Sequence, residues 1–198
     1  MNLEQYRTIF LTTTLILILI AATPVINATV SFPNGAEAFS ELWVLGPNHT
    51  IAEYPMQIKV GGGGKVILGV RNHLNYPAYY LVKVKFRNEI QPLPDALKSE
   101  PSPLPSLYEF RFFLGNGESW ESWFNFTVSG ASFSQESCLI KSIIINGTPL
   151  SMDVTSRLNP VKEGFYYQFF FELWLYDSAT QSLQYHGRFV SIWLNLIK

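Results

Sequence analysis

Apolar and polar residues alternate along most of the chain beyond residue 38, with the period of two that is typical of β-strands. In the clearest example, which begins at Ala78, four apolar residues share one side: Tyr80, Val82, Val84 and Phe86. Three basic residues share the other side: Lys83, Lys85 and Arg87. This pattern predicts a strand with one face in a core and its basic side chains in water.

Similar runs separated by turn residues predict about ten strands. The other predicted strands cover residues 39–45, 56–60, 65–71, 107–114, 119–128, 139–145, 150–155, 165–176 and 183–196. Gly115-Asn116-Gly117-Glu118 and Asn146-Gly147 are typical of hairpin turns. Residues 165–176 are apolar on both faces apart from Gln168 and Glu172, which indicates a central strand or one covered by a partner.

These elements indicate an all-β protein: an immunoglobulin-like two-sheet β-sandwich over residues 39–198, preceded by one N-terminal hydrophobic helix. A closed barrel is the alternative. Residues 91–106 contain five prolines, a density that no central strand accommodates, so we expect a long surface loop there. Residues 29–38 are expected to form a short linker.

The N-terminal 28 residues have the order of an export segment. Arg7 precedes the apolar stretch TIFLTTTLILILIAA, which ends in small residues. Counted from Ile9 to Ala28, the segment has the length that can span a bilayer. Two interpretations therefore stay open: a cleaved signal peptide or a retained signal-anchor helix that attaches the protein to the membrane.

Four Asn-x-Thr sequons follow, and none has a proline in the middle position. Their acceptors are Asn27, Asn48, Asn125 and Asn146. Attachment of a glycan requires an exposed asparagine in an exported segment. The sequons and the N-terminus together predict a glycoprotein at the cell membrane, with most of the chain outside the cytoplasm.

The composition argues against nucleic-acid binding and assigns the single cysteine a structural role. Charged residues make up only 15% of the chain and the net charge is −1, without a basic stripe, so nucleic acid is not an expected partner. A single cysteine, Cys138, is expected to be a small buried hydrophobic residue, with an intermolecular disulfide as the alternative.

Motifs of catalysis are not found in the sequence. Gly61 to Lys65 lacks the hydroxyl residue and the helix of a phosphate loop, and the three histidines do not have metal-ligand spacing. We therefore expect no catalytic residue, no cofactor and no metal site. Carboxylates such as Glu41 and Glu172 could meet in space, but the sequence does not select them.

The candidate contacts for a ligand or partner are Trp123, Trp174, His73 and Asn72. Trp120 and Phe124 fall on the inner face of their strand, whereas Trp123 falls on the outer face beside Asn125. Outward tryptophans can stack on sugar rings, although core packing is their commoner role. Asn72 and His73 either hydrogen-bond the backbone at a strand end or contact a ligand.

Several segments resemble the extracellular region of an archaeal membrane-protein family catalogued as domain of unknown function 1616. The similar segments are FSELWVLGPNHTIAEYP, IKVGGGGKVILGVRNHLNYPAYYLVKV and LGNGESWESWFNFTV. The resemblance covers most of residues 37–196. It implies an archaeal, membrane-tethered, outward-facing sandwich, and it supplies no catalytic residues.

The resulting hypothesis is a non-enzymatic module displayed at the cell surface, which serves as an interaction or structural subunit of a cell-envelope assembly. Its expected partner is a cell-envelope protein or a second copy of the chain, with the membrane held through the N-terminal helix. The alternative is a carbohydrate-binding module that uses exposed tryptophans to bind a glycan.

Overall fold

The structure is a computed structural model that describes residues 3–29, 38–161 and 163–198. The chain divides into two compact units, Met1–Ala38 and Phe39–Lys198, which are described separately. The linker expected over residues 29–38 falls almost entirely outside the described residues.

The first unit contains one helix, α1 (Leu3–Thr29). Apolar side chains are exposed at consecutive positions such as Ile9, Phe10 and Leu11, which point to different sides of a helix. A signal-anchor was one of the two interpretations of this segment. Among the residues that the structure describes, no helix combines the length and the apolar character needed to cross a membrane.

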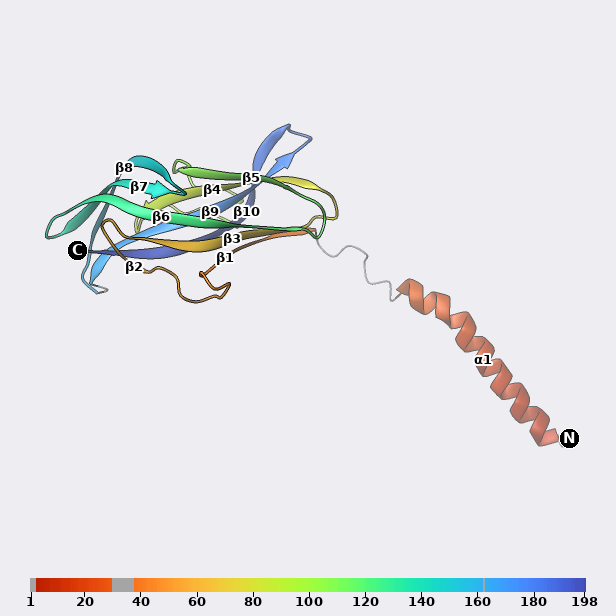
Figure 1. Cartoon of the computed structure of the whole chain (residues 1–198). Helices are drawn as coiled ribbons and strands as arrows, with labels where there is room; N and C mark the ends of the chain where they lie inside the picture. Colours follow the sequence, from red (N-terminus) through yellow and green to blue (C-terminus); the bar gives the residue numbers. More distant parts are fainter. Residues whose placement is uncertain (1–2, 30–37, 162) are drawn as a thin grey trace. The chain divides into compact units, whose positions relative to one another are not determined.

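The second unit is an immunoglobulin-like two-sheet β-sandwich (Figure 1). Its strands are β1 (Phe39–Leu45), β2 (Gln57–Lys59), β3 (Gly63–His73), β4 (Ala78–Asn88), β5 (Tyr108–Leu114), β6 (Ser119–Phe133), β7 (Ser137–Ile145), β8 (Thr148–Asn159), β9 (Gly164–Asp177) and β10 (Ser182–Ile197).

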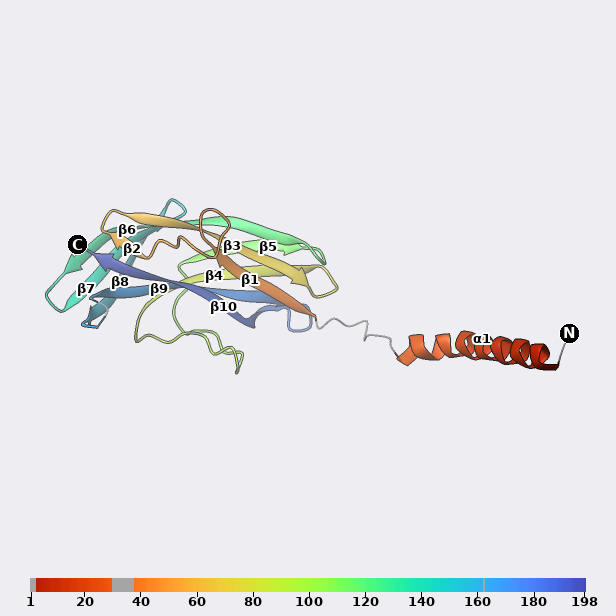
Figure 2. The ribbon, with the colours of Figure 1, turned by 90° about the horizontal axis from the view of Figure 1, so that it is seen from below.

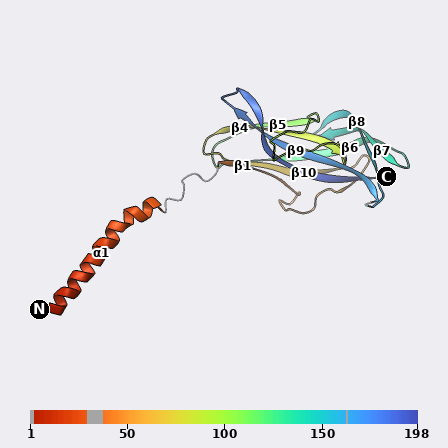
Figure 3. The same ribbon diagram turned by 180° about the vertical axis from the view of Figure 1, so that it is seen from behind.

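One sheet, sheet A, has the order β1-β3-β6-β7-β8, and the other, sheet B, has the order β2-β10-β9-β4-β5. The strands of sheet B are seen from the other side in Figure 3. At one side β8 joins the sheets, because Leu158 and Asn159 pair with β9. At the other side the described strands β1 and β10 do not pair, so the sandwich is open there and the closed barrel is not formed. We call this the open side.

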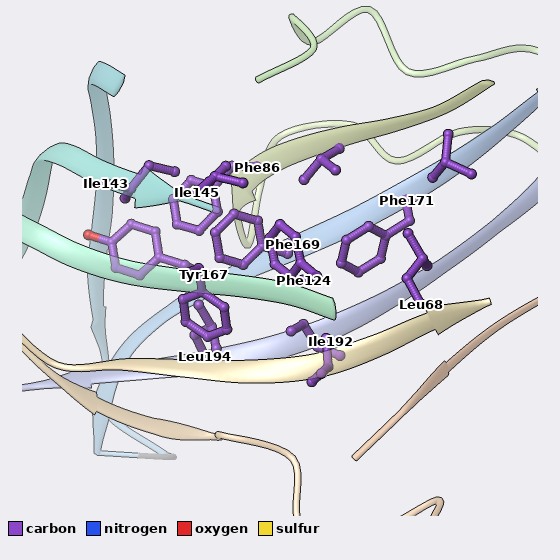
Figure 4. Packing of buried hydrophobic residues seen from close by; sticks show 14 of the residues in the cluster. Leu68, Phe86, Phe124, Ile143, Ile145, Tyr167, Phe169, Phe171, Ile192 and Leu194 are labelled. Carbon is purple, nitrogen blue, oxygen red and sulfur yellow. The ribbon is translucent and has the colours of Figure 1, made fainter. Parts of the chain in front are cut away.

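Aromatic residues dominate the core between the sheets. Phe124 of β6 makes edge contacts with Phe169 and Phe171 of β9, at ring-centroid distances of 5.1 and 5.0 Å (Figure 4). Aliphatic side chains such as Leu68 and Ile192 fill the space around these rings (Figure 4). The alternating apolar positions of the sequence are therefore the inner faces of the two sheets.

The position of β9 confirms one of the two interpretations of its two-faced apolar pattern. The strand lies in the middle of sheet B, between β4 and β10. Asn146 and Gly147 also form the predicted hairpin turn, between β7 and β8.

Two predictions about the strands are wrong. Lys85 and Arg87 do not face water: they are 4% and 7% exposed, because residues 91–106 cover the outer face of β4. The turn at Gly115 to Glu118 is not a hairpin, since β5 pairs with β4 in sheet B whereas β6 pairs with β3 and β7 in sheet A. Sequence shows that a chain turns, but not which sheet receives the next strand.

Candidate binding surfaces

The outer face of sheet B is occupied by a buried ion pair. Lys85 of β4 lies 2.9 Å from Glu172 of β9, and the side chains of the two residues are 5% and 0% exposed. The carboxylate also accepts hydrogen bonds from the Ser102 backbone N–H at 2.8 Å and from the Trp174 indole at 3.1 Å. Burial of a charged group away from water is costly. Here the opposite charge of the partner and the neighbouring hydrogen bonds compensate this cost for both Lys85 and Glu172.

The proline-rich loop, residues 91–106, is bound to this ion pair. Besides the Ser102 N–H, which donates to Glu172, the Ser102 carbonyl accepts a 2.6 Å hydrogen bond from Lys85. At the other end of the face, Arg87 donates to Gln168 at 2.7 Å and to the carbonyl of Gln91. The loop runs beside β9 and β10, on the side away from β3 and β6 (Figure 2). The loop therefore covers the part of this face around Lys85, Arg87 and Glu172, whereas Trp193 of β10, on the same face, stays 36% exposed.

Trp174 belongs to the same covered face. Lys83 lies 3.5 Å from the centre of its ring, and the Tyr185 ring packs beside it at 5.9 Å. Burial lowers the pKa of Lys83, and burial together with the charge of Glu172 raises the pKa of Tyr185 to about 12. Trp174 was expected to contact a ligand or partner; in the structure it is half-buried and engaged by its own chain.

The outer face of sheet A carries a different arrangement, which we call the tryptophan face: Trp43, Ile67, Gly69, Glu121 and Trp123. Trp43, Gly69 and Glu121 lie side by side across β1, β3 and β6, and Ile67 and Trp123 form the adjacent row. The Trp43 ring lies flat across Gly69: a Cβ atom there would come within 2.1 Å of the indole. Glu121 accepts hydrogen bonds from the Trp43 indole at 3.2 Å, and its other oxygen lies 3.3 Å from His49.

Trp123 faces outward, as the alternation of β6 predicts, and is 41% exposed. The Lys65 ammonium lies 5.0 Å from the centre of its ring, within the range of a cation–π contact. The structure thus brings two tryptophans, a carboxylate and an ammonium group onto one face. Sequence analysis did not place Trp43 on it, because the pairing of β1 with β3, which sets Trp43 opposite Gly69, cannot be read from the alternation of one strand.

A third surface lies at the open side and is called the open-side groove. One hollow of about 220 Å³ is lined by Val44, Tyr54, Met56, Ser191, Ile192 and Trp193. A second hollow of about 260 Å³ is lined by Met56, Gln57, Tyr166, Trp193 and Asn195. The two hollows share Met56, which is 59% exposed, and Trp193, which is 36% exposed. The groove is thus an accessible, mainly apolar surface beside β10.

Asn72 does not fit the expectation of a ligand contact, because it is fully buried. Its amide nitrogen donates to the carbonyls of Tyr76, Leu114 and Gly115 at 2.8 to 3.2 Å, and its side-chain oxygen accepts from the Leu74 N–H at 2.8 Å. All polar atoms of this side chain are used to hold two turns together, which is the backbone-bonding alternative.

His73 stacks on Phe39 at 4.6 Å, and its Nε2 lies 3.1 Å from Glu41. By the strand register His73 lies on the same outer side of sheet A as Gly69 and Trp43, but further along β3, where its contacts are with Phe39 and Glu41 of β1. The described residues contain no group of three or more His, Cys, Asp or Glu that could hold a metal ion.

Three of the four sequon asparagines have described side chains. Asn48 and Asn125 are exposed, and Asn146 is half-buried in the β7–β8 turn. Asn125 and Asn146 are neighbours: the Asn146 side-chain oxygen accepts from the Asn125 backbone N–H at 2.9 Å. The fourth acceptor, Asn27, lies in α1, and its side chain is outside the described residues.

The buried polar layer of sheet B was not predicted, although the sequence contains a signal for it. Gln168 and Glu172 are the two polar exceptions of β9, and they are four residues apart. Arg87 and Lys83 have the same spacing on β4 and are their partners in the strand register. Matching the polar exceptions of two antiparallel strands would have indicated that they face each other.

Similar solved structures are distant in sequence. The β-glucosidase of Listeria innocua in complex with glucose aligns at 10% identity and a TM-score of 0.43, over 82% of this chain but only 16% of that chain. The CARDB domain of a Pyrococcus furiosus protein aligns at 10% identity and a TM-score of 0.41, over 80% of this chain and 90% of that domain. No curated protein matches the chain.

The family profile described as "Domain of unknown function (DUF1616)" matches residues 33–136. This range includes the whole tryptophan face and the whole proline-rich loop, whereas the expected resemblance extended to residue 196. The chain belongs to the family of domain of unknown function 1616.

Proposed function

We propose that the protein is a non-enzymatic interaction module displayed outside the cytoplasm, which binds a cell-envelope protein through the open-side groove. The observation that carries this proposal is the groove itself, with Met56 and Trp193 exposed at its centre. Exposed apolar surface of this kind is typical of protein contacts, whereas the part of sheet B around Lys85 and Glu172 is already covered by the proline-rich loop.

The N-terminal unit supports the proposed location. Apolar side chains are exposed on all sides of α1, which is unfavourable in water and is typical of segments that the export machinery recognises. The described sequon acceptors lie on sheet A or in the loop after β1, away from the covered face of sheet B. None of these described acceptors lines the open-side groove.

A crosslinking experiment in the native host tests the groove. A photo-crosslinking residue at position 56 is compared with one at position 97, because Leu97 is equally apolar and 99% exposed but lies in the proline-rich loop. We expect one stoichiometric adduct from position 56 and none from position 97. Equal labelling at both positions, or no adduct at either, would contradict the proposal; an adduct with a second copy would identify self-association.

Carbohydrate binding is the second candidate, and the tryptophan face favours it. Trp43 and Trp123 lie on the same outer face, with Glu121 available to accept hydrogen bonds from sugar hydroxyls. A glycan array with the unglycosylated protein tests it, with Trp43→Ala and Trp123→Ala as matched variants. Binding that either variant abolishes would support this function, and a flat response would remove it.

A further inference from the structure

Trp123, Asn125 and Thr127 occupy alternate positions of β6 on the outer side of sheet A. The residues between and after them, Phe124, Phe126 and Val128, are at most 3% exposed and belong to the core. Alternate residues of a strand lie about 7 Å apart along one face. The exposed Trp123 ring is therefore the direct neighbour of the sequon asparagine on the same face.

Asn125 is positioned for modification by its own neighbours. Its side chain is exposed, and its Nδ2 donates to the Asn146 side-chain oxygen at 3.3 Å. N-linked attachment replaces one of the two amide hydrogens, so the remaining hydrogen can keep this bond. On its other side, Asn125 faces Lys65 in the strand register.

Trp123 offers a surface that suits a sugar ring. A pyranose has one apolar face of C–H groups, and an indole ring buries a large apolar area when such a face covers it. Lys65 lies at 5.0 Å from the ring centre, where its ammonium group can donate to sugar hydroxyls. Two adjacent rows of sheet A thus offer one sugar both an apolar surface, the Trp123 ring, and a hydrogen-bond donor, the Lys65 ammonium group.

We propose that Asn125 carries an N-linked glycan whose first sugar packs on Trp123 beside Lys65, so that the protein's own glycan covers this part of the tryptophan face. Attachment forms a bond between Nδ2 and the anomeric carbon of a lipid-phosphate-linked oligosaccharide. The bond from that carbon to the phosphate oxygen breaks, and the amide loses one proton. Of the proposed function, this inference requires only the export of the chain, not the partner.

The other described sequons provide natural controls. Two residues before the acceptor, Asn48 has Gly46 and Asn146 has Ile144, whereas Asn125 has a tryptophan. A glycan at Asn48 therefore lacks an aromatic neighbour at the same spacing. Any stabilisation that depends on Trp123 should be specific to the sugar at Asn125.

The first measurement is glycopeptide mass spectrometry of the full chain purified in detergent from its native host. We expect Asn125 to be modified, and an unmodified Asn125 would overturn the inference. The second is a double-mutant cycle between Thr127→Val, which removes the sequon but keeps the Asn125 side chain, and Trp123→Ala. We expect a coupling of about two- to tenfold in the unfolding equilibrium constant, the range of aromatic contacts.

Two controls separate the sugar from the protein. The same cycle in unglycosylated protein from a bacterial host, and a cycle that pairs Asn48→Gln with Trp123→Ala, should both show additive effects. Coupling that persists without the sugar, or additive effects with it, would overturn the inference. Crosslinking at position 56 is independent of these results, so failure of the partner proposal and failure of this inference are distinguishable.

Discussion

Replacement of Glu172 by leucine should strongly destabilise the sandwich. Among the residues that the structure describes, the substitution leaves the Lys85 ammonium, whose side chain is 5% exposed, with the Ser102 carbonyl as its hydrogen-bond partner at 2.6 Å. It also removes the acceptor of the Ser102 N–H and the Trp174 indole. Breaking a buried ion pair by removal of one partner costs about 3–5 kcal/mol, and we expect Glu172→Leu to lie in this range.

The structure also predicts the order of the related variants. Lys85→Met should cost less, about 2–3 kcal/mol, because Glu172 retains two neutral hydrogen-bond donors. The double variant Lys85→Met/Glu172→Leu should lie within about 2 kcal/mol of the wild type, since no unpaired charge remains buried. The matched control is Lys98→Met, which breaks an exposed pair with Asp95 at 3.6 Å and should change stability by less than about 0.5 kcal/mol.

Guanidinium unfolding followed by far-ultraviolet circular dichroism measures these differences without relying on the local environment of Trp174. Because Glu172 also holds Ser102, tryptic cleavage after Lys98 in the proline-rich loop should accelerate in Glu172→Leu under native conditions. The reasoning is refuted if Glu172→Leu costs less than about 1 kcal/mol, or if the double variant costs the sum of the two single variants.

Four further outcomes are expected. Burial raises the pKa of the Cys138 thiol, so a thiol reagent at pH 8 should react with it only after unfolding; rapid reaction in the native protein would contradict its placement. Burial lowers the pKa of His186, so the unfolded chain takes up a proton first: the stabilising contribution is present above about pH 6.5 and is lost as pH falls through the folded value. His186→Gln should therefore flatten the dependence of unfolding free energy on pH between about 7 and 5, and an unchanged slope would argue against it. Asn72→Ala removes four hydrogen bonds from a fully buried site and should cost about 3 kcal/mol or more in guanidinium unfolding, whereas a cost under about 1 kcal/mol would show that these bonds contribute little. Gly69→Ala should displace the Trp43 ring, lower the free energy of unfolding by about 1–3 kcal/mol and change the tryptophan fluorescence. Unchanged stability and fluorescence would show that the Trp43 ring does not lie over Gly69.

The sequence by itself determined where most strands lie and which of their residues point to the inner or the outer side. The period of two is a local property of the extended backbone, so the inner face of β6 and the outward position of Trp123 could be predicted from residues alone. The two apolar faces of residues 165–176 left a central strand and a partner-covered strand as alternatives, of which the structure confirms the first, and the proline density of residues 91–106 excluded a central strand there.

Only the tertiary structure decided what covers each face. Whether Lys85 meets water depends on a loop that begins several residues later in the chain and on Glu172, which is 87 residues away. The meeting of Trp43 with Trp123 depends on the pairing of β1, β3 and β6, and the assignment of β5 and β6 to different sheets depends on a turn that could equally form a hairpin. Local alternation fixes on which side of a strand a residue lies, whereas burial and contact depend on partners distant in the sequence, which the pattern of one strand does not encode.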